Sequence, residues 1–363
     1  MKKILIIVSI LFISCEIQEA KNGQKYLVKQ VSDIQANLIF DKTKVFPNNS
    51  QISIAIVENR LVTFYGVIRK NDTIYSFDNK NSVFEVGSIT KVFTSTLLAN
   101  AVVENKLKLE DNINDYLNFS WKDDTKITFQ SLANHTSGLP KKPSNLGSGL
   151  GNPDSRYRYY DEEKLKKYLT EDLRLTHKPG EKSKYSNLGV GVLGYTLCSV
   201  YNTDYEDLVQ DKIFETYQMK SSTSNKEKTA SFLVKGLDAS GNEVPNLDLS
   251  VLVGAGGILS TVEDLSKFVI AHFDNSNKEL QLTLQKTFSI NKGVDRGLSW
   301  RILRNSDAQT WYFHNGATPG YKSFIVMNTK TQNGIVILSN VSGYSKNQNN
   351  IDELGFELMK TLE

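Results

Sequence analysis

Cysteine and histidine are scarce in this sequence, and their scarcity excludes two kinds of chemistry. The chain has 2 cysteines, Cys15 and Cys198, and 4 histidines. Because Cys15 falls in an N-terminal leader, Cys198 has no internal disulfide partner, and its apolar neighbours predict that it is buried. The histidines are scattered and none forms an H-E-x-x-H pair, so we expect no metal centre.

A strong excess of charge of either sign is also missing. The 363 residues carry a formal net charge of +3, and the lysines lie among acidic residues, as at 161–167, which is typical of a solvated helix face. This pattern gives no reason to expect a nucleic-acid partner. With 39% hydrophobic residues and no low-complexity tract, the chain should fold, and its length suits about two structural lobes.

The N-terminal apolar run is too short to be a membrane helix. It covers 4–13, far fewer than the ~20 residues that span a bilayer, and it follows Lys2 and Lys3. This layout is typical of a secretory signal peptide, which we place at residues 1–14. We therefore expect the protein to be exported.

The end of this leader resembles a bacterial lipoprotein signal. Cys15 follows the small residue Ser14 where cleavage is expected, so a new N-terminal Cys15 would carry lipid. A plain signal peptide that ends nearby is the alternative. The polar segment 15–28 then forms a tether to a domain at 29–363, which places the protein in the periplasm or at the cell surface, with the lipid anchor as its only contact with a membrane.

Hydrophobic patterning predicts strands near both ends of the chain and helices between them. The predicted strands are 52–57, 61–68, 300–303, 311–314, 324–327 and 335–338. The predicted helices are 31–39, 92–103, 163–169, 190–200, 205–213, 262–273 and 351–362. We therefore expect an α/β (α+β) protein in which helices cover an antiparallel sheet, with the sheet lobe from about 29–80 and 290–363, an inserted helical lobe from about 100–250, and a cleft between the lobes.

A serine and a lysine three residues apart mark the first candidate site. Ser88 opens an amphipathic helical pattern, and Lys91 lies one turn further along the same face, where its amine can help to deprotonate the Ser88 hydroxyl. The helix N-terminus favours the negative charge that develops. Alone this pattern is weak, because a serine that caps a helix beside a solvated lysine has the same spacing. A second copy, Ser289-x-x-Lys292, lies in a polar stretch and is interpreted as chance.

A second candidate segment supplies a phenol and an amide. Tyr185 and Asn187 lie on a tight segment before a predicted helix. A phenol beside an ammonium loses its proton more readily and can relay it between the serine and a leaving group, while Asn187 can orient a substrate amide. The similar triplet at 116–118 is interpreted as packing residues at the end of a loop.

The third candidate segment follows an aromatic predicted strand. It contains His314-x-Gly316, the one His-x-Gly in the sequence. A strand edge with glycine can lie alongside an extended substrate, and the Ala317 N–H, together with that of Ser88, can form an oxyanion hole. The alternative is a strand-end histidine beside a turn glycine.

Three further patterns are interpreted as structural. Residues 189–194 match G-x-G-x-x-G, but no apolar strand precedes them, so close helix packing explains these glycines better than nucleotide binding. No G-x-S-x-G is present, which argues against an α/β-hydrolase. Asn134 and His135 are interpreted as residues that structure a loop.

Taken together and in this order, the three candidate motifs resemble those of the class C β-lactamases and serine DD-peptidases. The resemblance covers roughly residues 50–345 and is strengthened by the segments 84–91, 132–140, 179–180, 256–261 and 316–321. It implies the β-lactamase/transpeptidase-like fold, acylation of Ser88 followed by hydrolysis of the acyl-enzyme, and no cofactor. It also implies shared acid and base roles for Lys91 and Tyr185, and substrate contacts from Asn187, His314, Gly316 and Ala317.

The resemblance implies a small-molecule or peptide substrate: β-lactams, D-alanyl-D-alanine peptides of the cell wall, or both. One departure bears on this choice. Class C β-lactamases usually have Lys-Thr-Gly where this chain has residues 314–316, and a histidine is more often neutral than a lysine. A promiscuous carboxylesterase is therefore an alternative, as is a penicillin-binding sensor that deacylates slowly. The sequence leaves open whether Lys91 or Tyr185 takes the serine proton.

Overall fold

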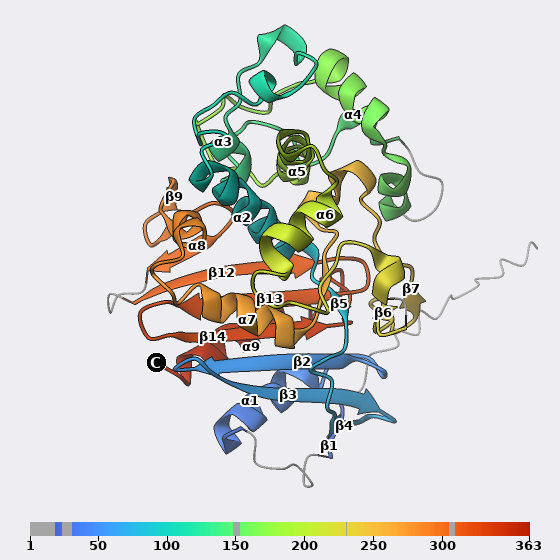
Figure 1. Ribbon diagram of the computed structural model, residues 1–363. Coiled ribbons are helices and arrows are strands. Elements are labelled where there is room, and N and C mark those ends of the chain that lie inside the picture. The colour runs from blue at the N-terminus through green and yellow to red at the C-terminus, as the bar shows by residue number, and fades with distance from the viewer. Residues whose placement is uncertain (1–18, 24–30, 148–152, 230, 305–308) are drawn as a thin grey trace, which may run out of the picture.

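A ten-stranded sheet built from both ends of the chain supports the protein (Figure 1). The computed structural model describes residues 19–23, 31–147, 153–229, 231–304 and 309–363. The predicted signal peptide and Cys15 lie outside the described residues. In spatial order the strands are β1 (Lys21–Asn22), β4 (Thr73–Ser76), β3 (Leu61–Lys70), β2 (Gln51–Glu58), β14 (Asn333–Ser339), β13 (Lys322–Asn328), β12 (Thr310–Ala317), β11 (Arg301–Arg304), β10 (Val294–Arg296) and β9 (Phe288–Asn291).

Strands from the two chain ends meet in the middle of this sheet. β2 lies beside β14, with Ile54 opposite Ile337, and neighbouring strands run antiparallel except for β1, which pairs in parallel with β4. Nearly every residue of β2 and β14 is buried, as expected for strands covered on both faces. Each predicted strand overlaps one of these elements, whereas the short strands β1, β4, β9 and β10 were not predicted.

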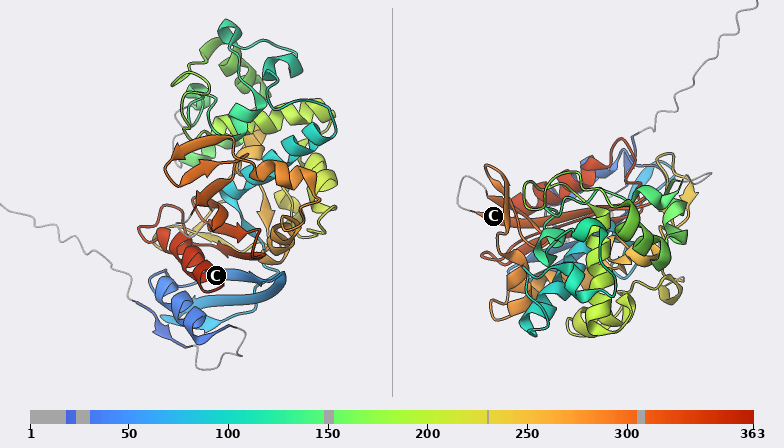
Figure 2. Two further views of the ribbon diagram at one scale, coloured as in Figure 1. Left: turned by 90° about the vertical axis from the view of Figure 1, so that its left-hand side faces the viewer. Right: turned by 90° about the horizontal axis from the view of Figure 1, so that it is seen from above.

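Helices cover both faces of the sheet (Figure 2). α1 (Asp33–Thr43) and α9 (Asn349–Lys360) pack against one face, and α7 (Val262–Ala271) packs against β2 and β14 on the other. The two faces of the sheet border two separate hydrophobic cores, and alternate side chains of β14 enter one or the other. Ile337 belongs to the core below α9, and Val336 belongs to the core below α7.

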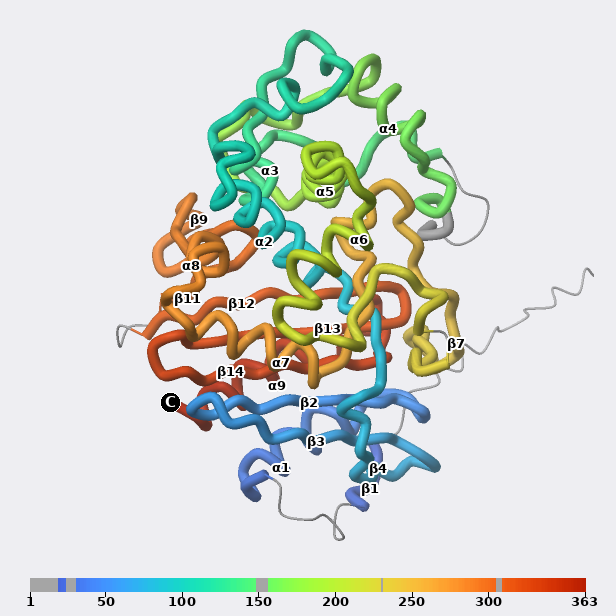
Figure 3. Tube along the Cα trace, in the orientation of Figure 1, coloured from blue at the N-terminus to red at the C-terminus, as the bar shows by residue number. Residues whose placement is uncertain are grey.

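The helical lobe lies beyond the α7 face of the sheet (Figure 3). Most residues of α2 (Thr90–Val103) are buried, and this helix contacts its neighbours in the lobe on several sides. The other helices of this part are α3 (Phe129–Ala133), α4 (Glu162–Lys167), α5 (Asn187–Tyr201), α6 (Tyr205–Val209) and α8 (Lys278–Leu284). Two small ribbons join them: β5 (Phe84–Glu85) with β8 (Leu259–Ser260), and β6 (Gly236–Leu237) with β7 (Glu243–Val244).

Two predicted helices end differently in the structure. The predicted helices 163–169 and 205–213 continue past α4 and α6 as π-helical turns at Tyr168–Asp172 and Gln210–Phe214. A helical spacing of apolar residues does not distinguish such a turn from an α-helix, because both keep one face buried. No helix in the described part of the chain is both long and apolar enough to cross a membrane.

The prediction of a tether at 15–28 is wrong for its described residues at the sheet edge. Lys21 N–H donates to Asp72 O, and Ala20 is buried. Cys198, which was predicted to be buried, is only partly buried on α5. The sheet edge therefore begins earlier in the sequence than predicted.

Candidate active site

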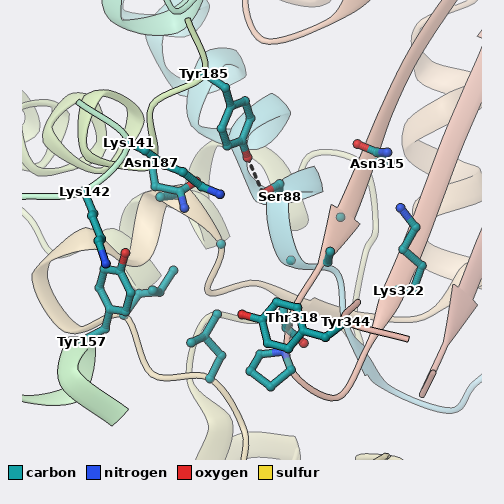
Figure 4. A pocket seen from close by; sticks show the side chains of 18 of the residues that line it. Ser88, Lys141, Lys142, Tyr157, Tyr185, Asn187, Asn315, Thr318, Lys322 and Tyr344 are labelled. Carbon is teal, nitrogen blue, oxygen red and sulfur yellow. Dashed lines mark hydrogen bonds between the residues drawn. The ribbon is translucent and has the colours of Figure 1, made fainter. Parts of the chain in front are cut away.

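Ser88 lies on a tight 3₁₀ turn, η2 (Gly87–Ile89), that leads into α2. The α-helix begins at Thr90, two residues after the predicted start, and Ser88 lies in the 3₁₀ turn that runs directly into it. Gly87 has a φ of +51°, a left-handed conformation that glycine adopts at little cost. The β5–β8 ribbon immediately before the turn fixes its entry. The Ser88 side chain lines a cavity between the lobes (Figure 4).

Lys91 is completely buried beside Ser88. Its Nζ lies 3.0 Å from Ser88 Oγ and donates to Ala255 O at 2.5 Å. Burial, followed by the positive charge of Lys141, holds the pKa of the Lys91 amine well below its usual range. The amine is therefore poised to accept the hydroxyl proton of Ser88.

Tyr185 reaches Ser88 from the segment that precedes α5 (Figure 4). Its phenol oxygen lies 2.5 Å from Ser88 Oγ, and its ring centroid lies 4.9 Å from Lys91 Nζ. Burial raises the pKa of the Tyr185 phenol, although the hydrogen bond with Ser88 and the charge of Lys141 act in the opposite direction. The expectation that a nearby ammonium makes this phenol lose its proton more readily is thus outweighed by burial. The phenol stays protonated at neutral pH and can donate a proton.

Strand β12 passes directly against the η2 turn. A Cβ atom on Gly316 would lie 2.1 Å from Val86 O and 3.0 Å from Ser88 N, so this approach requires glycine. A Cβ atom on Gly87 would likewise lie 3.0 Å from Ala317 N. The backbone nitrogens of Ser88 and Ala317 therefore lie on either side of the close contact between β12 and the η2 turn. Two N–H groups placed in this way suit the stabilisation of an oxyanion.

His314 is a buried residue of β12. Its side chain is 4% exposed and is not among the described residues that line the cavity beside Ser88. The ring Nδ1 lies 2.8 Å from Asn315 O, to which it donates in the neutral form. Burial, followed by the charges of Lys91 and Arg301, holds the pKa of the imidazole well below its usual range. The ring is neutral and supplies no fixed charge to a substrate carboxylate.

Asn187 is the first residue of α5 and lies in the cavity wall. Ser186 precedes it as the cap of the helix, accepting from Gly189 N–H at 2.8 Å and donating to Pro140 O at 2.6 Å. The Asn187 N–H donates to Lys141 O at 3.1 Å. These contacts hold the Asn187 side chain toward the cavity, where it can bind a substrate amide (Figure 4).

The cavity itself has a volume of about 550 Å³. Its described lining combines basic and apolar side chains, and no carboxylate is among them. The basic residues are Lys141, Lys142, Arg156, Arg301 and Lys322, and the aliphatic residues include Leu146, Leu247, Leu249 and Pro319. None of these residues was predicted, because single lysines and leucines in loops form no pattern. The one available signal was the Lys141-Lys142 pair directly after the 132–140 motif.

His135 holds the segment that carries Tyr185. Its carbonyl oxygen accepts the Lys184 N–H at 2.8 Å, and its Nδ1 accepts the Ser186 N–H at 3.3 Å. The ring centroids of His135 and Tyr185 are 4.6 Å apart. Burial holds the pKa of the His135 ring well below its usual range, so the ring is neutral. The prediction that His135 structures a loop is confirmed, and this loop positions the phenol.

Replacing His135 by alanine should slow Ser88 acylation by about 10- to 100-fold, because a displacement of about 1 Å can cost ~10²-fold. Asparagine tolerates the φ of +63° at this position and keeps an acceptor close to Nδ1, so His135→Asn should recover much of the rate. Steady-state kinetics should show the loss in kcat rather than in KM. In a Tyr185→Phe background His135→Ala should add little, whereas an equal loss in both backgrounds would contradict action through the phenol.

The repeated motifs have structural explanations. The second Ser-x-x-Lys copy lies at strand β9, where Ser289 Oγ donates to Asp295 Oδ1 at 2.8 Å. Tyr116, in the second Tyr-x-Asn triplet, donates from its hydroxyl to Asp111 Oδ2 at 2.6 Å. Ser289 and Tyr116 each donate a hydrogen bond to a neighbouring carboxylate. Both contacts agree with the interpretation that these copies have no catalytic role.

The glycine-rich segment at 189–194 serves helix packing. A Cβ atom on Gly194 would lie 3.2 Å from the Cα atom of Gly254, so the glycines let α5 approach η10 (Ser250–Ala255) closely. Among the residues that the structure describes, no three His, Cys, Asp or Glu side chains are grouped as a metal site would require.

Solved structures similar to this chain share its fold. A β-lactamase/D-alanine carboxypeptidase from Pseudomonas syringae has a TM-score of 0.73 at 21% sequence identity, with 91% of this chain and 97% of that chain covered. A class C β-lactamase from Rhodobacter sphaeroides has a TM-score of 0.75 at 18% identity, with 91% and 99% covered. The predicted β-lactamase/transpeptidase-like fold is therefore confirmed.

Relatives identified by sequence align with this chain over only part of their own length. Protein flp of Staphylococcus aureus (strain MW2) is 27% identical over 281 residues, which cover 71% of this chain and 53% of that protein, so the chain spans about half the length of this relative. A β-lactamase of Pseudomonas fluorescens is 26% identical over 261 residues, 69% of each protein. The Beta-lactamase family model matches residues 52–358, and the chain therefore belongs to the Beta-lactamase family.

Proposed function

We propose that the protein forms an acyl-enzyme at Ser88 and hydrolyses β-lactams, D-alanyl-D-alanine peptides of the cell wall, or both. One observation carries the proposal: Ser88 Oγ lies 3.0 Å from the buried Lys91 amine and 2.5 Å from the Tyr185 phenol, beside an open cavity. A hydroxyl between a base and an acid is an activated nucleophile. The names of similar structures, a class C β-lactamase and a β-lactamase/D-alanine carboxypeptidase, support this substrate class.

In the proposed reaction the neutral Lys91 amine takes the Ser88 proton while Oγ attacks the substrate carbonyl carbon. The N–H groups of Ser88 and Ala317 bind the oxygen that becomes negative. The Tyr185 phenol then gives its proton to the leaving nitrogen as the carbon–nitrogen bond breaks, and the proton held by Lys91 restores the phenol. A water molecule then attacks the acyl carbon and gives a proton to the same pair of groups. The pair returns this proton to Ser88 Oγ as the acyl bond breaks, which releases the acid and free Ser88.

The acylation rate should rise with pH and fall again only in alkaline solution. Lys91 must be neutral to accept a proton, so the rate increases as the pH passes the Lys91 pKa, which lies well below 10.5. Tyr185 must be protonated to donate, so the rate falls only as the pH passes the Tyr185 pKa, which lies above 10.0. The pH profile of kcat/KM measures both limbs. If the rate of acylation rose only as the pH approached the ordinary pKa of lysine, the proposed neutral state of Lys91 would be wrong.

Intact mass spectrometry with several acyl donors tests the proposal most directly. Labelled penicillin should form a covalent adduct, and the protein should cleave nitrocefin or a D-Ala-D-Ala peptide. Ser88→Ala should show neither adduct nor turnover, and Tyr185→Phe should slow both. If the protein forms no penicillin adduct and cleaves neither substrate, the proposed substrate class is wrong.

A carboxylesterase that uses the same serine is the second candidate. The buried, neutral His314 favours it, because a neutral ring offers no fixed charge to the carboxylate of a β-lactam or peptide. Rates on p-nitrophenyl esters compared with rates on nitrocefin decide between these candidates. The lifetime of the Ser88 adduct in the same mass experiment separates both from a slowly deacylating sensor.

We further propose that the protein is exported and carries lipid on Cys15. The charged and apolar leader followed by Ser14-Cys15 supports this proposal. Cells that express the protein should incorporate labelled fatty acid into it, and Cys15→Ala should remove the label and release the protein from membranes. A Cys15→Ala protein that stays membrane-bound and labelled would contradict lipidation at this residue.

A further inference from the structure

Basic side chains predominate in the described lining of the cavity. Five of its described lining residues are basic and none is a carboxylate. Lys322 has a partner, since its Nζ lies 2.8 Å from Asp352 Oδ1 on α9. Lys141 and Lys142 differ, because within the described residues neither amine has an acidic side chain at ion-pair distance. Among the described residues, Lys141 and Lys142 are therefore two positive charges at the site without an acidic partner.

These two lysines lie beside Asn187. The Lys141 carbonyl oxygen accepts the N–H groups of Asn187 and Leu188 at 3.1 and 3.2 Å, so the backbone that carries the lysines is fixed to the start of α5. In the view of Figure 4 the side chains of Lys141 and Lys142 lie on the same side of the cavity as Asn187 and Tyr157, and β12 lies on the other side. A substrate whose amide is bound by Asn187 would extend its next atoms toward both amines.

Lys141 also acts on the reacting groups at a distance. Its charge contributes to lowering the pKa of the Lys91 amine and opposes the raised pKa of the Tyr185 phenol. Its ammonium therefore lies within electrostatic range of the Ser88 centre. A cleft with apolar walls and charges of one sign attracts ligands of the opposite sign.

Building on the acyl-enzyme function proposed above, we propose that Lys141 and Lys142 bind an anionic group on the acyl part of the substrate, beyond the amide held by Asn187. The preferred acyl donors carry a carboxylate close to that amide. This group is distinct from any carboxylate on the leaving part of the substrate. Both lysines are exposed, so the attraction is electrostatic and sensitive to salt.

Three penicillins with one core test this inference. Benzylpenicillin, carbenicillin and ampicillin differ at one side-chain carbon, which carries hydrogen, a carboxylate or an ammonium. The measured quantity is the second-order rate of Ser88 acylation by intact mass. Carbenicillin should acylate about tenfold faster than benzylpenicillin at low ionic strength, ampicillin should be slowest, and added salt should compress the series.

The double variant Lys141→Ala/Lys142→Ala should reduce the ratio of carbenicillin to benzylpenicillin rates to about one. The ratio cancels any effect of Lys141 on Lys91 or Tyr185, because both donors meet the same reacting groups. Lys126→Ala is the matched control: Lys126 is exposed and outside the cavity lining, so the ratio should not change. Thermal melting checks that each variant is folded.

Two outcomes overturn the inference, and they are distinguishable. If benzylpenicillin acylates Ser88 but carbenicillin has no advantage, or if the advantage survives the double substitution, the anionic acyl group is wrong and the acyl-enzyme proposal stands. If none of the three penicillins modifies Ser88, action on β-lactams fails, and this inference fails with it.

Discussion

Replacing Lys91 by methionine should lower the rate of Ser88 acylation by about 10³-fold or more, because general-base assistance contributes ~10²–10⁴. The substitution removes the only nitrogen placed 3.0 Å from Ser88 Oγ in the described site. Methionine fills nearly the same buried volume without a polar group, so the protein should remain folded. Nitrocefin hydrolysis and adduct formation measure the loss, and circular dichroism with urea unfolding checks the fold.

The chain contains its own control for this substitution. Lys292 occupies the equivalent position in the second Ser-x-x-Lys copy and is exposed. Lys292→Met should therefore keep the rate within about twofold of the unmodified protein, as surface substitutions usually do. If Lys91→Met retained a rate similar to that of Lys292→Met, Lys91 would not be the base, and the phenol of Tyr185 would have to accept the proton.

Replacing Gly316 by alanine should destabilise the protein by about 3 kcal/mol and slow acylation by about 10²-fold. The new Cβ atom would lie 2.1 Å from Val86 O and 2.3 Å from Ser323 Oγ, and both neighbours are held in place. β12 would have to move away from the η2 turn, which separates the N–H groups of Ser88 and Ala317. Urea unfolding measures the first effect, and the rate of penicillin adduct formation measures the second.

Ser323→Ala is the control for Gly316→Ala. It removes a hydrogen bond at the same contact between β12 and the η2 turn without adding an atom to it. The Ser323 hydroxyl donates to Val86 O at 2.7 Å, so its removal should cost about 1 kcal/mol without displacing β12. Its effect on acylation should be far smaller than that of Gly316→Ala. Equal urea midpoints for Gly316→Ala and the unmodified protein would show that the strand can yield, and would contradict the proposed need for glycine.

The groups that we propose to react were predictable because each lies in a short local pattern. A spacing of three residues places Lys91 one helical turn from Ser88, whatever the rest of the chain does. The identity of Tyr185 was predictable but the direction of its side chain was not, because that direction depends on hydrogen bonds that the segment before α5 donates to His135 and Pro140. Those contacts join segments that are distant in sequence, and no periodicity reports them.

The burial of His314 has a geometric cause. Side chains alternate along a strand, so His314 and Gly316 lie on the same face of β12. Gly316 allows that face to touch the η2 turn, and His314 is therefore covered by the same contact rather than exposed to the cavity. The alternation of side chains can be inferred from the sequence, but the position along β12 at which η2 makes contact cannot. The short strands β9 and β10 were missed for a related reason, because polar residues on an edge carry little hydrophobic pattern.

We expect the pairing of β2 with β14 to determine when Ser88 becomes reactive. Ser88 is synthesised early, yet the strand that completes its surroundings, β12, joins a sheet closed by the last strand of the chain. Such long-range pairing forms slowly. During refolding, labelling of Ser88 by penicillin should therefore occur later than helix formation. The delay would measure when strands from the two ends of the chain pair.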